Sequence, residues 1–471
     1  MKLTPLRAKI HIPFIVSVLL IALLSYARFW STGSLGLDTA FPPRPAAEAI
    51  GFLFTVAALL AGYGYWNAVM HGAELGLSFE RTLRLAKILG TLSLIALPLL
   101  SNDIFIYLSC GQAPLLGANP YTDVALLPGT SYHQYVPPIW ASGPYCKYGP
   151  AAVSISQFAA LVGGSSPLAG IFAWKLLVFA AFLLFCDATA LLLKRFGTTD
   201  GPAAPFILLC PILWAQAAGQ GHNDIFAALF LVGSLLALAH GRFLLSILLL
   251  TVGMQVKFYL LPLFVLFFLA WWQTVGLTRR SALILALSIL CAAGFTVLLH
   301  YPYWDGWGTI TAIYGPLVNE QPMNNLAYLI PYGLTVIIPA LRPYQAAIET
   351  GLHLSLTVTV ALLSLWQLRR LIQKRDLPYL VFVRIMALVI CFAALRFHAW
   401  YFIALLPLCA AGLPMVWLRW GALMFPLTLI FDIHNFLPRD SLILMTILPA
   451  TVVLVNLLFL YRLRERLSGL P

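Results

Sequence analysis

Apolar runs of about 20 residues, the length that crosses a bilayer as an α-helix, recur from one end of the chain to the other. The 471-residue chain is 61% hydrophobic and only 9% charged, and its mean hydropathy of +0.91 excludes a water-soluble domain. Backbone polar groups in lipid must pair internally, and helices pair them within one segment. We therefore expect an all-α polytopic integral membrane protein, with about 11–14 transmembrane helices in a single domain over residues 1–471.

The candidate crossings can be placed to within a few residues. They are 12–28, 50–70, 86–100, 168–193, 203–220, 224–240, 242–256, 258–274, 281–300, 346–368, 379–396, 399–414, 420–437 and 441–461. No small-x-small cleavage site follows the first run, so we expect it to stay as a helix rather than be removed as a signal. Two weaker stretches, 151–163 and 326–340, would break the in/out alternation and are expected to be re-entrant or interfacial.

Clusters of lysine and arginine indicate the orientation, because they collect in cytoplasmic loops. They are Lys2/Arg7/Lys9, Arg81/Arg84/Lys87, Lys194/Arg195, Arg279/Arg280, Arg369/Arg370/Lys374/Arg375, Arg419 and Arg462/Arg464/Arg466. Placing them inside puts both termini in the cytoplasm, and segments 101–149 and 301–325 on the extracytoplasmic face of a plasma membrane. Anionic membrane lipids beside these loops account for the net charge of +12, so we expect no nucleic-acid partner.

The segment 101–149 is crowded with proline, glycine and tyrosine, which excludes one long helix and favours short ordered elements at the membrane interface. Two of the seven cysteines, Cys110 and Cys146, lie in it. If the segment faces an oxidising compartment they could form a disulfide, and otherwise they stay free, because the sequence does not show their geometry.

Ionisable side chains at the edges of the apolar runs are the candidate site residues, because a charge there is costly unless it is paired or wetted. Asn102 and Asp103 open segment 101–149 in "SNDIFIY", where Asp103 is either a base or a helix-terminal carboxylate satisfied by nearby amides. "GQGHNDIFAAL" presents His222, Asn223 and Asp224 at one depth, as a helix cap or as contacts to sugar or phosphate.

Two further stretches supply cations. Lys257 in "MQVKFYLLP" is either a snorkelling lysine or a phosphate contact. Arg396 and His398 lie beside Trp400 in "LRFHAWYFIALLPL", which also fits an interfacial aromatic belt. No zinc spacing, EF-hand or DxD pattern is present, so we expect no cofactor and no metal site, although a divalent metal stays open.

The motifs "SNDIFIY", "GANPY", "YGP", "HNDI", "VKFYLLP" and "RFHAWYF", in that order over about residues 85–410, resemble polytopic glycosyltransferases of the GT-C class. The nearest resemblance is to the bacterial polyprenol-phosphate-mannose-dependent α-mannosyltransferases. It implies an inverting transferase that moves a sugar, mannose in the nearest relatives, from a polyprenyl-phosphate donor to a lipid or glycan acceptor hydroxyl at the extracytoplasmic face.

That resemblance assigns roles to the candidate residues. Asp103 matches the base, although it follows the third apolar run rather than the first, which leaves Asp38, Glu48 and Asp224 as rivals. The residues expected to bind the donor phosphate are Lys257, Arg396, His222 and His398, in that order of preference. Those expected to contact the sugar or the acceptor are Asn102, Asn119, Tyr148, Asn223, Asp224 and Trp400.

Two other classes of membrane protein would also need polar groups facing outward. A transporter or flippase of lipid-linked sugars predicts polar residues near the midplane and an internal repeat, and the sequence shows neither. An O-antigen ligase or polymerase is disfavoured only by the "HND" motif and the segment that Asp103 opens. The donor sugar, the acceptor and the oligomeric state stay open.

Overall fold

The computed structural model describes residues 5–36, 42–123, 129–136, 146–276, 278–314, 326–374, 378–390, 398–413 and 415–430. Over these residues the chain is helical, and its one β-type feature is an isolated bridge between Asp305 and Trp307. The all-α class is therefore confirmed. Several predictions concern residues outside this set, among them Asp38, Arg396, the last parts of the crossings at 379–396 and 420–437, and the whole crossing at 441–461.

The elements of the first half of the chain begin near the predicted crossings. They are α1 (Pro5–Thr32), α2 (Arg44–His71), α3 (Phe79–Ser93), α4 (Asp103–Leu115), η2 (His133–Tyr135), α6 (Pro150–Gly163), α7 (Pro167–Phe196), α8 (Ala203–Leu208), the π-helical η3 (Leu213–Gly219) and α9 (Asp224–Ala239). In α7, Ser166 caps the first turn by accepting a hydrogen bond from the amide of Ala169 at 3.3 Å, and Gly197 ends the helix at φ +66°.

The second half continues with shorter pieces between long helices. They are α10 (Phe243–Met254), η4 (Phe258–Leu260), α11 (Leu263–Val275), α12 (Arg279–His300), η5 (Tyr301–Tyr303), α13 (Gly306–Tyr314), α15 (Leu326–Ile337), η6 (Pro339–Tyr344), α16 (Gln345–Ile372), α17 (Pro378–Leu388), η8 (Ala399–Ala404), η9 (Leu406–Ala411) and α18 (Met415–Ile430).

Six helical stretches in the described part are long and apolar enough to cross a membrane, which makes the protein a polytopic integral membrane protein. They are Ala8–Thr32, Arg44–His71, Pro167–Phe196, Phe258–Val275, Arg279–Tyr303 and Pro339–Ile372. Other predicted crossings are shorter apolar helices, among them α9 and α10, and the stretches 151–163 and 326–340 form the short helices α6 and α15.

Two predicted crossings are wrong in detail. The run at 86–100 is helical only to Ser93, where α3 ends, and residues 94–102 then lead as a non-helical segment into α4. The run at 399–414 forms the two 3₁₀ turns η8 and η9, with Pro407 at the start of the second. Proline lacks the amide proton that a continuous α-helix would need there, and protein rather than lipid surrounds much of this segment.

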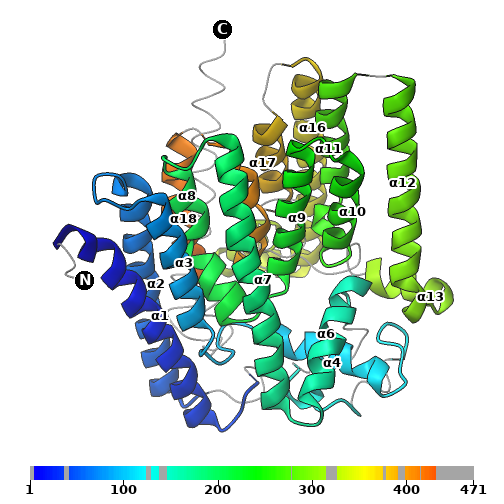
Figure 1. Ribbon diagram of the computed structural model, residues 1–471. Helices are drawn as coiled ribbons and strands as arrows, with labels where there is room; N and C mark the ends of the chain where they lie inside the picture. Colours follow the sequence, from blue (N-terminus) through cyan, green and yellow to red (C-terminus); the bar gives the residue numbers. More distant parts are fainter. Residues whose placement is uncertain are drawn as a thin grey trace.

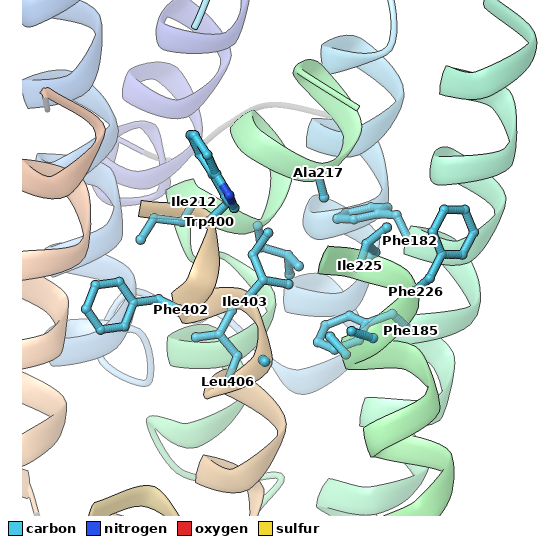
Figure 2. Close-up of a cluster of buried hydrophobic side chains, with 14 of the residues drawn as sticks. Phe182, Phe185, Ile212, Ala217, Ile225, Phe226, Trp400, Phe402, Ile403 and Leu406 are labelled. Atoms are coloured by element: carbon cyan, nitrogen blue, oxygen red, sulfur yellow. The ribbon is translucent and has the colours of Figure 1, made fainter. Parts of the chain in front are cut away.

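Figure 2 shows that burial. Ile403 and Leu406 lie toward Ile225 of α9 and Phe185 of α7, so the two 3₁₀ turns pack inside the bundle. At one end of the bundle, α4 and α6 lie together beside the lower part of α7 (Figure 1). Gly111 allows this approach, because a Cβ there would lie 2.3 Å from the backbone of Ser156.

Candidate active site

Asp103 begins α4 and is held in place by a side chain from a distant part of the sequence. The Oε1 atom of Gln220 accepts hydrogen bonds from the amides of Leu99 at 2.7 Å and Leu100 at 2.8 Å, which fixes the non-helical segment before the helix. The hydroxyl of Ser101 accepts from the amide of Asp103 at 3.1 Å. The side chain of Asp103 is 24% exposed, so its carboxylate is reachable although its surroundings are buried.

Tyr107 lies one helical turn after Asp103, and its hydroxyl donates to Asp103 Oδ2 at 3.1 Å. Burial, and then the neighbouring carboxylate of Asp103, raise the pKa of Tyr107 well above 10. The phenol therefore keeps its proton and acts as a hydrogen-bond donor to the carboxylate. Tyr107 is not among the site residues predicted from sequence, although its spacing of four residues from Asp103 in a helix could have revealed it.

The turn before α9 brings His222 to the same carboxylate. Trp174 donates from Nε1 to the carbonyl of Gly221 at 2.6 Å, and Gly221 adopts φ +79°, which favours glycine. His222 Nδ1 then lies 3.5 Å from the Tyr107 hydroxyl and 3.8 Å from Asp103 Oδ2. Burial, and then the charge of Lys257, lower the pKa of His222 well below 6.5, so the imidazole is neutral at physiological pH.

An indole stacks on two imidazoles at this point. The ring of Trp400 stacks on His222 at 3.9 Å with an interplanar angle of 17°, and on His398 at 4.2 Å with 10°. This stacking fixes the orientation of the His222 ring. Stacking of a sugar on Trp400, and contact of His398 with phosphate, stay predictions.

Asp224 and Lys257 form a buried ion pair beside this stack. Lys257 Nζ lies 3.1 Å from Asp224 Oδ2, and Tyr259 donates to Asp224 Oδ1 at 2.8 Å. The ammonium group also lies 5.1 Å from the centre of the Tyr148 ring and 5.7 Å from that of Tyr401, within cation–π range. The snorkelling interpretation of Lys257 is therefore replaced by a paired lysine among aromatic rings.

This pairing separates Asp103 from its rivals. Asp224 is fully buried and both of its oxygens face a donor, so it is less suited to accept a proton from a substrate. Glu48 is an exposed residue of α2 that pairs with Arg44 at 3.0 Å. Asp38 lies outside the described residues, and among the described candidates Asp103 combines access with nearby hydrogen-bond donors.

Tyr148 joins α4 to the lysine. A disulfide links Cys110 to Cys146 with Cα atoms 5.6 Å apart, and the ring of Tyr148 meets that of Tyr107 edge-on at 4.8 Å. Gly149 lies directly against the Lys257 turn, where a Cβ would be only 2.1 Å from the carbonyl oxygen of Gln255. The disulfide that the sequence left open is thus present, and it holds Tyr148 between α4 and Lys257.

Three asparagines complete the set of residues predicted to contact the sugar or the acceptor. Asn102 is the buried N-cap residue of α4, and Asn223 is fully buried beside Asp224. Asn119 serves the local fold, because its Oδ1 accepts from the amide of Tyr121 at 3.0 Å and its Nδ2 donates to the carbonyl of Tyr303 at 2.9 Å. Contact of these three residues with substrate stays a prediction. Within the described ranges, no group of three or more His, Cys, Asp or Glu is arranged to hold a metal ion.

The chain matches a family of known proteins. The family model described as "Alpha-(1->6)-mannopyranosyltransferase, N-terminal domain" matches residues 16–274, more than half of the chain. The chain is 25% identical over 337 residues to Alpha-(1->6)-mannopyranosyltransferase A of Mycobacterium tuberculosis, covering 66% of this chain and 63% of that protein. It is 29% identical over 140 residues to Alpha-(1->6)-mannopyranosyltransferase B of Corynebacterium glutamicum, covering 29% and 23% respectively.

These matches cover only part of the relatives, and none of them is to a solved structure. The aligned region spans less than two thirds of the length of either curated relative. No solved structure matches the chain. The matched region, 16–274, contains Asp103, Tyr107, His222, Asp224 and Lys257, whereas His398 and Trp400 lie beyond it.

Proposed function

This chain belongs to the alpha-(1->6)-mannopyranosyltransferase family, and from that membership we propose that it is an inverting membrane mannosyltransferase. The proposed donor is a polyprenyl phosphate carrying mannose, and the proposed acceptor is a hydroxyl of a glycan or a lipid. The observation that carries the proposal is the position of Asp103, a reachable carboxylate on the same cluster of side chains as the buried cation of Lys257.

Asp103 is the proposed general base. The acceptor oxygen attacks the anomeric carbon, a new C–O bond forms, and the hydroxyl proton passes to a carboxylate oxygen of Asp103. The donor hydrogen bond from Tyr107 holds Oδ2 in a fixed direction, which favours one geometry for proton transfer. His222 Nδ1 lies 3.8 Å from the same oxygen, and the His222 ring is fixed by stacking on Trp400.

At the same time the bond from the anomeric carbon to the phosphate oxygen of the donor breaks. Its electron pair stays on that oxygen, and the polyprenyl phosphate departs as the leaving group. A phosphate is a good leaving group and needs no general acid, but its developing charge is stabilised by a cation in a partly dry site. Lys257 is the proposed cation, with His222 and His398 lining the approach. With a base and a cation supplied by side chains, the proposed reaction uses no cofactor.

Asp224 has a supporting role in this scheme. Its carboxylate favours the charged form of Lys257, which burial alone would discourage. The donor phosphate would then share Lys257 with Asp224, while Tyr148 and Tyr401 keep the ammonium group at the site. Asn223, fully buried next to Asp224, is the proposed sugar contact at this position.

The site is proposed to face the extracytoplasmic side of the plasma membrane, with both termini in the cytoplasm. The disulfide between Cys110 and Cys146 supports this orientation, because such bonds persist on the oxidising side of a membrane. The basic turn at Arg242 supports it from the other end, since it lies at the end of α9 that is remote from Asp224.

The test is transfer of mannose by purified protein from a polyprenyl-phosphate mannose to candidate acceptors. We expect transfer by the wild type and a loss of roughly 10²–10⁴-fold in Asp103→Asn, the usual contribution of a general base. Glu48→Gln is the matched control, because it removes an exposed carboxylate that pairs with Arg44 at 3.0 Å. Full activity of Asp103→Asn would remove Asp103 as the base. Absence of transfer from every polyprenyl-phosphate sugar would favour a transporter.

A further inference from the structure

A groove of about 440 Å³ opens at the end of the bundle remote from Asp103. It is lined by Gly241, Arg242, Phe243, Leu244, Leu245, Leu248, Trp271 and Ile284. The residues come from the turn between α9 and α10, the first turns of α10, the end of α11 and the start of α12. Because α9 runs from Asp224 to this turn and α10 runs back toward Lys257, the groove and the candidate active site occupy opposite ends of one helical hairpin.

The floor and wall of this groove are apolar. Phe243 stacks on Trp271 with ring centres 4.2 Å apart and an interplanar angle of 15°. Leu244 and Leu245 are exposed beside this pair, and the exposed Leu283 and Leu287 of α12 continue the apolar surface along the helix. In a membrane protein this surface faces lipid, so the groove is open to an acyl chain.

The rim of the groove is positively charged, and no acidic side chain among the described residues pairs with it. Arg242 lines it, and Arg280 lies one turn before Ile284 on the same face of α12, with Arg279 adjacent. All three arginines are exposed, and none forms an ion pair within the described part of the chain. Residues 225–304 contain no aspartate or glutamate, so no acid from this stretch can neutralise them.

We propose that this groove binds an anionic phospholipid. Arg242 and Arg280 bind the headgroup phosphate, and an acyl chain lies along Leu244, Leu245 and Leu248. The combination of charges and apolar wall favours a lipid over free phosphate, which would use the arginines but not the leucines. The stacked Phe243 and Trp271 place an aromatic surface at the depth where headgroup and chain meet.

The groove also lies where a bound lipid would steady the hairpin that carries Asp224 and Lys257. Ser234 of α9 and Ser246 of α10 already hold the two helices together, each hydroxyl donating to the carbonyl of the other residue, at 2.7 and 2.9 Å. The lipid would join the open end of this pair to α11 and α12. Lipid binding does not depend on the proposed transferase activity and can be measured without it.

The experiment measures lipid binding to the full chain in detergent by native mass spectrometry. The probes are phosphatidylglycerol, phosphatidylcholine of the same chain length, and inorganic phosphate as a competitor. We expect preferential binding of phosphatidylglycerol, weakened roughly fivefold by each of Arg242→Gln and Arg280→Gln. The charge-retaining Arg242→Lys should keep most of the affinity, and Arg84→Gln, an exposed arginine of α3, should leave it unchanged.

Each alternative outcome would overturn the proposal. Equal binding of phosphatidylcholine would show that charge does not select the lipid. Unchanged phosphatidylglycerol binding by the Arg242→Gln/Arg280→Gln double variant would place the lipid elsewhere. Displacement of the lipid by millimolar inorganic phosphate would show an anion site without a lipid requirement. The variants change exposed arginines remote from Asp103, and lipid binding is measured without any transfer reaction, which separates this test from that of the proposed function.

Discussion

At the scale of single residues, the contact between Tyr107 and Asp103 is the most direct test of how the base is positioned. Tyr107→Phe removes the hydroxyl that donates to Asp103 Oδ2 and keeps the ring against Tyr148 and Trp174. A hydrogen bond to a charged group contributes about 1.5–3 kcal/mol, so we expect kcat to fall roughly 10- to 100-fold. The measurement is kcat for mannose transfer at saturating donor and acceptor.

Tyr65→Phe is the matched control for that variant. Tyr65 is a buried tyrosine of α2 whose hydroxyl donates to the carbonyl of Phe206, away from Asp103. The control should lower thermal stability without lowering kcat. An equal kcat in Tyr107→Phe and wild type would show that the phenol acts on the fold and not on the base.

His222 gives a pH dependence of stability whose sign follows from its burial. The folded pKa is lowered by burial first and by Lys257 second, whereas the unfolded value is about 6.5. Below about pH 6.5 the unfolded chain therefore binds a proton that the folded chain does not, and stability is lost as pH falls toward the folded pKa. Above that pH the contribution is fully present.

We expect the free energy of unfolding of the detergent-solubilised protein to fall as the pH is lowered from about 7.5 to 5, and this one group contributes a slope of at most about 1.4 kcal/mol per pH unit. The unfolding temperature, measured at each pH, should fall with it. His222→Phe keeps a ring on Trp400 but cannot titrate, so it should flatten this dependence. His240→Phe changes an exposed histidine at the other end of α9 and should not. Equal slopes in all three proteins would contradict the lowered pKa of His222.

At the scale of elements, the stability of the α9–α10 hairpin depends on the buried ion pair of Asp224 and Lys257 at one end of it. Lys257→Met leaves the carboxylate of Asp224 buried without its cation, which costs about 3–5 kcal/mol. The double variant Asp224→Asn/Lys257→Met removes both charges and should recover most of that stability. Transfer should stay lost in both variants, because neither supplies a cation for the departing phosphate.

Thermal unfolding of the two single variants and the double variant measures this coupling. Ser154→Ala provides a matched loss of one polar contact, since the Ser154 hydroxyl lies 3.0 Å from that of Tyr303, outside the hairpin. Additive stability losses from the two single variants would contradict a coupled pair. Transfer activity in the double variant would remove Lys257 from the proposed donor site.

The sequence predicts which stretches form the candidate site, but not how their side chains pair. The stretches around Asp103, His222, Lys257 and Trp400 could be selected because polar groups at the edges of apolar runs are rare. Their pairing could not be predicted, because the contact of Lys257 with Asp224 and the stack on Trp400 are set by packing between distant segments. Residues 399–414 were assigned to a crossing because hydropathy does not distinguish a buried 3₁₀ segment from a lipid-facing helix.

At the scale of the whole molecule, the helical membrane fold followed from the repeated apolar runs, because lipid leaves a segment few other ways to pair its backbone. The length of each crossing did not follow, since α9 and α10 are short apolar helices enclosed in part by their neighbours. The proposed orientation is supported by two independent features at opposite ends of the bundle, the disulfide of α4 and the arginines near Gly241.

That orientation can be tested with one cysteine at each end. In a Cys291→Ser background, which removes the exposed free cysteine of α12, Gln134→Cys places a thiol in the segment after α4 and His240→Cys places one beside the basic turn. If the site faces outward, a membrane-impermeant maleimide should label intact cells at position 134 and not at 240, and both should react after lysis. Labelling of position 240 in intact cells would reverse the orientation. Asp103 and the disulfide would then face the cytoplasm, where thiols are kept reduced and the Cys110–Cys146 bond would not persist.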